Sequence, residues 1–234
     1  MLSSNHSPQK ILGSLFSALL FLAISCVPTS AEVLYTNGAP DLTNTGETFN
    51  ADNNLIVRDM VGDVFTPTAS GTANTVNFAG LYFSSNTVPT SDTFTITLYS
   101  VSAGAPNTLL DTSTLSGETR TPVGAGGLDG DYTVYDFSGT LNTTFSLSTG
   151  TSYYLGIADA TSPYEGFNVA YSDGSATSLY QGVVGVGNFE SDPGHALSFS
   201  LNAVPEPTTA PLLLGGLGLL AFWHRRTRRS TFPV

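Results

Sequence analysis

The stretch Thr93-Phe94-Thr95-Ile96-Thr97-Leu98-Tyr99 alternates polar and apolar side chains, and this alternation decides the fold class. Successive side chains of a β-strand point to opposite faces, so Phe94, Ile96 and Leu98 share one face and the residues between them share the other. The pattern predicts a half-buried strand, with its apolar face on a core.

Outward from this stretch, short alternating runs recur between clusters of Gly, Asn, Asp, Ser and Pro. No long amphipathic helix is indicated, and the glycine-rich segment 124–131 is predicted to be a loop. The predicted fold is all-β, an antiparallel β-sandwich or jelly roll of about ten strands. Besides 93–99, strands are predicted at 32–36, 61–66, 75–84, 132–138, 143–148, 152–158, 167–172, 179–182 and 195–204. The predicted core consists of Val64, Phe65, Val76, Phe78, Leu81, Phe83, Phe94, Ile96, Leu98, Val134, Phe137, Phe145, Leu147, Leu155, Ile157, Phe167, Val169, Leu197, Phe199 and Leu201.

Charged residues are few and unevenly distributed along the chain. Only 11% of the 234 residues are charged, and the formal net charge is −11. Five of the seven basic residues lie near the ends, whereas all the acidic residues except Glu206 lie within 32–204. Residues 32–204 therefore hold 17 acidic and two basic residues, a formal charge of −15. Binding to nucleic acid or anionic lipid depends on Lys and Arg that neutralise phosphate. The composition therefore argues against nucleic acid and favours cations, neutral polymers or basic surfaces as partners.

The first 31 residues have the pattern of a secretory signal peptide. A polar start with Lys10 precedes an apolar run over 11–27, and small residues lead up to Ala31. We predict cleavage after Ala31. Two alternatives stay open: a lipoprotein signal in which Cys26 is acylated, and a signal anchor that is retained. Cys26 is the only cysteine, so the domain that follows the signal contains none.

The C-terminal part combines three short features in order. Val204-Pro205-Glu206-Pro207 opens a proline-rich linker, an apolar span covers 208–224, and the basic tail 225–229 contributes Arg225, Arg226, Arg228 and Arg229. As a helix the span would measure about 25 Å, less than the bilayer hydrocarbon core of about 30 Å. By the positive-inside rule the arginines stay cytoplasmic, which places the preceding domain outside. The predicted organisation is a signal peptide (1–31), a β-domain (32–203) and a C-terminal signal with a short transmembrane helix (204–230).

These C-terminal residues resemble the PEP-CTERM sorting signal of exported bacterial proteins. The resemblance covers 204–230 and implies that an exosortase, a membrane protease, recognises the chain and processes it near Pro-Glu-Pro. It further implies the export machinery as a partner, an inner-membrane-anchored precursor, and a final location at the cell surface or in an extracellular, polysaccharide-rich matrix or biofilm. The runs 34–40 and 153–157 resemble the β-rich domains that precede such signals, which implies no activity.

Few residues of the β-domain suggest chemistry. His195 is its only histidine, and the absence of Lys and Cys excludes most nucleophile–base pairs, histidine-rich zinc sites and Schiff-base chemistry. A Ser-His-Asp arrangement through His195 and Asp192 stays open, although no Gly-x-Ser-x-Gly turn accompanies it. Asp129, Asp131 and Asp136 offer oxygen ligands that suit a structural Ca²⁺, but the other EF-hand positions are missing, and a solvated acidic turn is the alternative. No cofactor is predicted.

All ten tyrosines lie in the β-domain, where an exposed ring could stack on a sugar. Tyr164, in the loop Ser162-Pro163-Tyr164-Glu165-Gly166, is the predicted candidate for such a contact. The predicted function is that of a non-catalytic surface or extracellular-matrix protein. The alternative is a secreted carbohydrate-binding, lectin-like module or a glycan-active hydrolase, with extracellular polysaccharide as its partner.

Overall fold

The computed structural model describes residues 31–42, 48–50, 59–82, 88–126, 132–160, 167–173, 178–183, 189–203 and 218. Residues 31–204 form one compact unit, here called the β-domain. The remaining residues, 1–30 and 205–234, form a second unit, of which only Gly218 is described. The predicted signal peptide and transmembrane span therefore stay predictions. Within the described residues, no helix has both the length and the apolar character that a membrane crossing requires.

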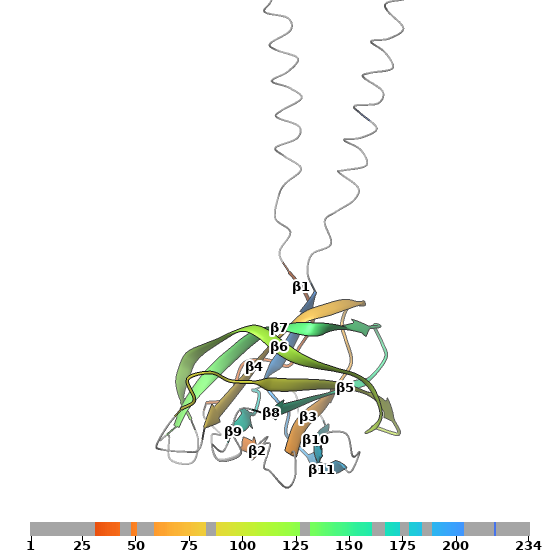
Figure 1. The fold of residues 1–234 in the computed structure, drawn as a ribbon. Coiled ribbons are helices and arrows are strands. Elements are labelled where there is room, and N and C mark those ends of the chain that lie inside the picture. The colour runs from red at the N-terminus through yellow and green to blue at the C-terminus, as the bar shows by residue number, and fades with distance from the viewer. Residues whose placement is uncertain are drawn as a thin grey trace, which may run out of the picture. The chain divides into compact units, whose positions relative to one another are not determined.

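The described part of the β-domain contains twelve strands, and all their pairings are antiparallel (Figure 1). The predicted all-β, antiparallel fold is confirmed, with two strands more than predicted, while the sandwich or jelly-roll arrangement stays a prediction. The strands are β1 (Glu32–Thr36), β2 (Thr48–Asn50), β3 (Asp59–Phe65), β4 (Gly71–Tyr82), β5 (Phe94–Ser102), β6 (Ala105–Gly126), β7 (Tyr132–Leu147), β8 (Tyr153–Asp159), β9 (Phe167–Ala170), β10 (Ser178–Val183), β11 (Phe189–Pro193) and β12 (Phe199–Ala203).

The strand β6 divides the sheet into two halves. The hydrogen-bonded order is β1-β12-β4-β7-β6-β5-β8-β3-β10-β11, and β9 lies beside β4 with β2 next to it. The first part of β6 pairs with β5 and the second part pairs with β7, with the change at residues 114–115. The β4 half consists of β1, β12, β4 and β7, together with β9 and residues 115–126 of β6. The β8 half consists of β5, β8, β3, β10 and β11, together with residues 105–114 of β6.

The sequence did not predict β6, and the expected loop at 124–131 is wrong in its first part, because Gly124–Gly126 pair with β7. Most side chains of β6 are exposed, including Leu109 and Leu110, so the strand lacks the apolar alternation of a half-buried strand. A register shift follows Ser116, and Gly117 there has a φ of 61°, which favours glycine. Backbone pairing to β5 and β7 therefore holds β6 in the sheet, although its side-chain pattern does not predict a strand.

The main hydrophobic core lies between the two halves. Phe78 of β4 stacks on Phe137 of β7 with 5.3 Å between ring centroids, and Phe94 of β5 meets Phe78 edge-on at 4.9 Å. All the predicted core residues are buried except Val64, which is half-buried, and Phe83, which lies outside the described residues. Full burial of such a side chain contributes about 1.5 to 3 kcal/mol before conformational entropy is subtracted.

The strand β8 is buried on both faces. Every residue of β8 is buried, and on the side away from the main core Tyr154 packs with Tyr99 of β5 beneath Phe189 of β11. Thr97 and Tyr99, predicted for the outer side of a half-buried strand, are therefore buried too. The sequence predicted β10 but not β11, so the covering residue Phe189 was not predicted.

Two directly paired glycines make room for the cluster on this face. Gly62 of β3 lies opposite Gly156 of β8. A Cβ at Gly62 would overlap the Leu155 carbonyl oxygen and the Tyr154 ring, and a Cβ at Gly156 would overlap the Met60 sulfur. The close approach of backbone and side chains therefore requires glycine at both positions.

A buried carboxylate ties the segment after β1 to both halves of the sheet. Asp63 of β3 is fully buried, and its Oδ2 accepts hydrogen bonds from Asn37 Nδ2 and from the Leu197 backbone N, each at 3.2 Å. Asn37 Nδ2 also donates to the Leu197 carbonyl oxygen at 3.3 Å. Burial of a polar group costs less when it accepts such hydrogen bonds, and these bonds fix Asn37 next to the turn at Gly38.

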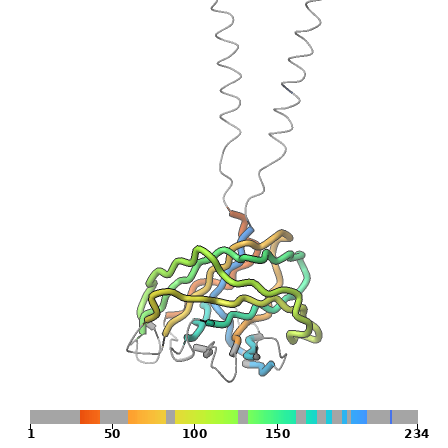
Figure 2. The backbone as a smooth tube through the Cα atoms, in the orientation of Figure 1, coloured from red at the N-terminus to blue at the C-terminus, as the bar shows by residue number. Residues whose placement is uncertain are grey.

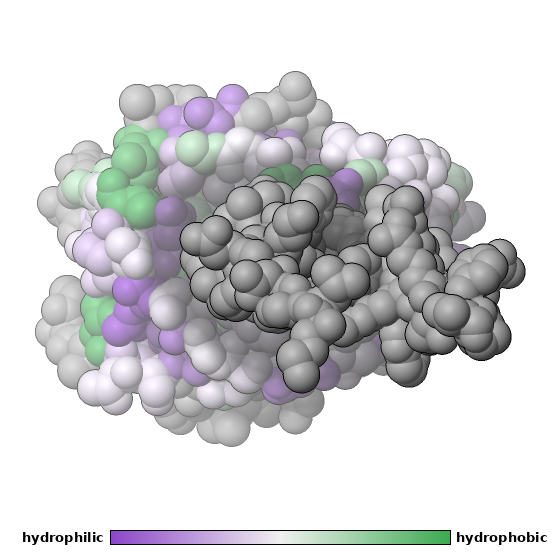
Figure 3. Space-filling view, turned by 90° about the horizontal axis from the view of Figure 1, so that it is seen from above, coloured by the Kyte–Doolittle hydropathy of each residue, from purple (hydrophilic) through white to green (hydrophobic). Residues whose placement is uncertain are grey.

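The first and last strands of the β-domain lie side by side. Glu32 at the start of β1 pairs with Ala203 at the end of β12, and Figure 2 shows the red and blue ends of the tube together. On the face that Figure 3 shows, hydrophobic residues form small, separate areas among hydrophilic and neutral ones.

Candidate functional site

The residues singled out from the sequence lie mostly outside the described part of the chain. This is the case for Tyr164, for Asp129 and Asp131, for the sorting residues 204–207 and for the basic tail 225–229. Among the described residues, no three acidic, histidine or cysteine side chains are grouped so that they could hold a metal ion. The predicted calcium and sugar contacts therefore stay predictions.

His195 lies just before β12 and is half-buried. Its ring stacks on Tyr171, with 4.4 Å between ring centroids and 3° between the ring planes. Asp192 lies in β11, and its side chain is not among those described. The geometry thus shows a packing contact for His195, and the Ser-His-Asp arrangement with Asp192 lies outside the described side chains.

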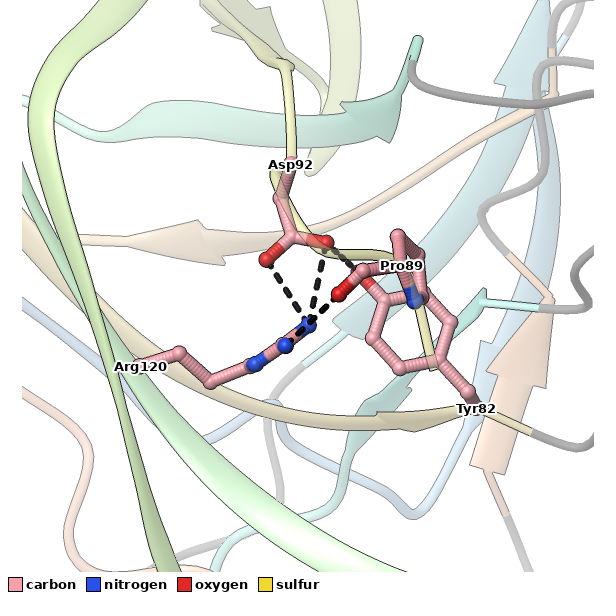
Figure 4. A network of polar contacts seen from close by, with 4 residues as sticks. All are labelled: Tyr82, Pro89, Asp92 and Arg120. Atoms are coloured by element: carbon pink, nitrogen blue, oxygen red, sulfur yellow. Dashed lines mark hydrogen bonds and ion pairs between the residues drawn. The ribbon is translucent and has the colours of Figure 1, made fainter. Parts of the chain in front are cut away.

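A network of polar contacts, here called the clasp, joins Arg120, Asp92, Pro89 and Tyr82 (Figure 4). Arg120 of β6 reaches across to Asp92, just before β5, with Nη1 at 3.0 Å from Oδ2 and 3.3 Å from Oδ1. Its Nη2 donates to the Pro89 carbonyl oxygen at 2.7 Å, and the Tyr82 hydroxyl donates to Asp92 Oδ1. The guanidinium also lies over the ring of Tyr135, 5.2 Å from its centroid. These contacts fasten the segment before β5 to β4 and β6.

The electrostatics of the clasp are those of one cation among several acids. Arg120 is the only Lys or Arg in the described residues, and the Asp92 side chain is 4% exposed. Burial, and then the nearby charges of Asp92 and Asp159, raise the pKa of Glu118 to about 7, which Arg120 only partly offsets. Burial and the hydrogen bond to Asp92 raise the pKa of Tyr82 far above its usual value. The guanidinium of Arg120 is already bound by Asp92 and by the Pro89 carbonyl oxygen, so the arrangement serves the stability of the fold.

A second polar feature crosses the outer face of the β4 half. Thr36 of β1 is paired with Ser200 of β12, Ser200 with Asn77 of β4, Asn77 with Ser138 of β7, and Ser138 with Thr119 of β6. Residues paired in this way point to the same face of a sheet. They form one straight row of hydrogen-bonding side chains over five neighbouring strands, here called the polar ladder.

The polar ladder forms the floor of a groove with a volume of about 440 Å³. Gly38, Ala39 and Pro40 form one wall, and a second row with Asp136 and Thr121 adjoins the ladder on the floor. Phe78, Phe137 and Phe199 also line the groove, although their rings belong to the main core on the other side of the sheet.

Local hydrogen bonds fix the wall and half of the floor. The Ser198 hydroxyl donates to the Gly38 carbonyl oxygen at 3.1 Å, and the Gly38 N donates to Thr36 Oγ1 at 3.4 Å. Gly38 has a φ of 92°, a conformation that L side chains rarely adopt, so the turn into the wall requires glycine. On the floor, Asn77 Nδ2 donates to Ser200 Oγ at 3.0 Å.

The other half of the floor is chemically available. Thr119, Thr121, Ser138 and Asp136 have no hydrogen-bond or ion-pair partner for their side chains within the described part of the β-domain. Partial burial raises the pKa of Asp136. The groove therefore offers hydroxyl donors and acceptors together with one carboxylate, a set that can bind a ligand rich in hydroxyl groups.

Sequence reasoning missed the polar ladder. Each of its members is the polar partner in an alternating strand, which is the ordinary composition of a solvent-facing edge of a sheet. Only the register of four pairings shows that they share one row. Asn77 is no distinguishing local signal either, because the same strand also contains Asn74.

Comparison with known proteins bears on the C-terminal part of the chain. The family described as the PEP-CTERM protein-sorting motif matches residues 203–229. A search of curated proteins finds no match. The match starts at Ala203, the last residue of β12, so the sorting motif begins where the described strands end. The predicted resemblance is confirmed: this chain carries a PEP-CTERM protein-sorting motif at residues 203–229.

Proposed function

We propose that this chain is the precursor of an exported surface or extracellular-matrix protein that an exosortase recognises and processes. The observation that carries the proposal is the PEP-CTERM protein-sorting motif at 203–229, which implies exosortase recognition, export and a membrane-anchored precursor. Processing near Pro205-Glu206-Pro207 would release a product that keeps β12. Since Phe199 and Leu201 of β12 are core residues, this product keeps an intact core.

We further propose that the β-domain has no catalytic role and serves in the cell envelope, matrix or biofilm through its surface. Two contacts support this proposal. The His195 ring is engaged with Tyr171, and Arg120 is engaged with Asp92, so the residues best suited to catalysis already have packing or structural partners. The signal peptide ending at Ala31 and the membrane span at 208–224 belong to the same proposal, as does the sandwich or jelly-roll arrangement of the two halves around the main core.

The alternative function is that of a carbohydrate-binding, lectin-like module, with hydrolysis of a glycan as a less supported variant. The observation that favours it is the groove of about 440 Å³ over the polar ladder, because hydroxyl, amide and carboxylate groups are those that hydrogen-bond sugars. The two functions are compatible, since a sorted matrix protein can also hold polysaccharide.

Two epitope tags on the full chain test the sorting proposal. The first is inserted between Ala103 and Gly104, an exposed turn at the tip of the β5–β6 hairpin, and the second follows Val234. In cells that have an exosortase, we expect the surface-located protein to keep the first tag and to lose the second. A surface-located protein that carries both tags would contradict processing.

A matched variant shows whether the motif itself is responsible. We expect the triple substitution Pro205→Ala, Glu206→Ala and Pro207→Ala to retain the second tag, and deletion of the exosortase gene to have the same effect. Loss of the second tag in both backgrounds would assign the cleavage to another protease.

A further inference from the structure

We propose that the groove over the polar ladder binds a stretch of uncharged polysaccharide that lies across the strands of the β4 half. This inference rests on the alternative function above and deepens it, since it names the site, the direction of the chain and the class of sugar. It does not depend on how the chain is sorted.

The spacing of the polar ladder is the first support. Neighbouring strands lie about 4.8 Å apart, so five paired residues span about 19 Å across the sheet. The members from Thr36 to Thr119 therefore present hydrogen-bonding groups at a regular interval along a straight line. A linear polymer of sugar units presents hydroxyl groups at a regular interval as well. Several units can thus bind at once, which compensates for the modest strength of each hydrogen bond.

The second support is that the groove is fixed before any ligand arrives. The wall at Gly38 is held by Ser198 and Thr36, and the Asn77 amide is held by Ser200. Binding therefore does not need to order these groups, so little conformational entropy is lost. On the side of β6 and β7, the hydroxyls of Thr119 and Ser138 have no partner among the described residues and can bind the ligand directly.

Charge selects the class of sugar. No Lys or Arg lines the groove, and Arg120 faces the opposite side of β6, where it is paired with Asp92. Asp136 lies on the floor, in a domain whose residues 32–204 carry a formal charge of −15. A polymer that carries carboxylates or sulfates would be repelled, whereas uncharged hydroxyl groups can donate to Asp136.

The experiment measures binding of the full chain, in detergent micelles, to three immobilised polymers. These are a neutral glucan, the amine-bearing polymer chitosan and the polyuronate alginate. We expect binding to the neutral glucan and none to alginate. We expect the double substitution Asn77→Val with Ser138→Val, which removes the centre of the polar ladder, to weaken glucan binding at least tenfold.

The matched control is a second cross-strand pair on the same two strands. Thr72 of β4 pairs with Ser146 of β7, both are exposed, and neither lines the groove. We expect Thr72→Val with Ser146→Val to bind the glucan as the wild type does. Thermal unfolding checks that both double variants fold, and the single exposed substitution Thr119→Val, expected to weaken binding severalfold, replaces the ladder variant if that variant does not fold.

Three results would overturn the proposal: no binding of the wild type to the neutral glucan, binding to chitosan or alginate alone, or equal losses in the ladder and control variants. Each can be separated from a failure of the sorting proposal, because removal of the C-terminal tag is scored independently in cells. A chain that is processed normally but binds no glucan would be a sorted surface protein without this site.

Discussion

The outer faces of the two halves of the sheet differ sharply, although both are built from antiparallel strands around one core. Outside the β8 half, Tyr99 and Tyr154 form an aromatic cluster that Phe189 of β11 covers. Outside the β4 half, Asn77 and Ser138 lie in a row of hydroxyl and amide groups at the bottom of a groove. One face is therefore closed by the chain itself, and the other presents polar groups.

This difference separates what maintains the fold from what can meet a partner. The face of the β8 half buries large rings, and each ring that stays buried contributes to stability. The face of the β4 half buries little apart from a small cluster around Leu81 and Val134. Substitutions on the first face should thus change stability, and those on the polar ladder should change binding alone.

The largest effect is expected at Gly62, where the Tyr154 ring of the aromatic cluster outside the β8 half lies closest to the backbone. We expect Gly62→Ala to lower the free energy of unfolding by at least about 3 kcal/mol, because the new methyl group would overlap the Leu155 carbonyl oxygen and the Tyr154 ring. Urea unfolding followed by near-ultraviolet circular dichroism measures it.

A glycine of the other half provides the control for this prediction. A Cβ at Gly139 of β7 would lie 3.1 Å from the Cβ and from a Cδ of Leu115, which is a tight contact but not the overlap with backbone oxygen found at Gly62. We expect Gly139→Ala to cost clearly less than Gly62→Ala. Equal losses would mean that the close approach around Tyr154 is no tighter than packing in the β4 half.

The next effect concerns the residue that covers the aromatic face. Phe189 lies 5.3 Å from the ring centroids of both Tyr99 and Tyr154 and is itself half-buried. We expect Phe189→Ala to destabilise the protein by about 2 kcal/mol, less than for a fully buried phenylalanine. It should also increase the binding of a hydrophobic dye, since two rings become accessible. Unchanged dye binding would show that another segment covers this face.

The contrast between the halves also marks the extent to which the sequence predicts the structure. The alternation at Phe94, Ile96 and Leu98 predicted the inner face of β5 correctly, because one face of nearly every strand meets the main core. The burial of Thr97 and Tyr99 was not predicted, since it depends on β11, which pairs from far along the chain.

The candidate site was predictable only in part. The sorting motif at 203–229 is a local pattern, so the sequence sufficed to identify it. The polar ladder depends on register across five strands, which local alternation does not determine. The strand β6, which contributes Thr119 and Thr121, was missed because its side chains are mostly exposed and its place is set by backbone pairing.

A smaller effect is expected at Glu118, which lies near Asp92 of the clasp. Burial and the charges of Asp92 and Asp159 raise its pKa to about 7, above the value of about 4.3 in an unfolded chain. Between these pH values the folded state holds a proton that the unfolded state has released. The contribution of Glu118 is thus most favourable below about pH 4.3, and it falls as the pH rises to about 7.

The substitution Glu118→Gln isolates this contribution. We expect the difference in free energy of unfolding, variant minus wild type, to become more positive as the pH rises from about 4.5 to about 7.5, and then to level off. Urea unfolding of both proteins at several pH values measures it. The nearby Arg120 and the partial exposure of Glu118 keep the effect small. A difference that does not depend on pH would contradict the raised pKa.

The smallest effect is expected on the polar ladder itself. Ser138 makes no side-chain hydrogen bond within the described residues, and Asn77 bonds only to Ser200. Valine is also a good strand residue, so the double substitution Asn77→Val with Ser138→Val should change the free energy of unfolding by no more than about 0.5 kcal/mol. The same unfolding measurement checks it. Side chains that serve binding alone can be replaced without destabilising the core beneath them. A loss as large as that of Phe189→Ala would therefore mean that the polar ladder maintains the fold.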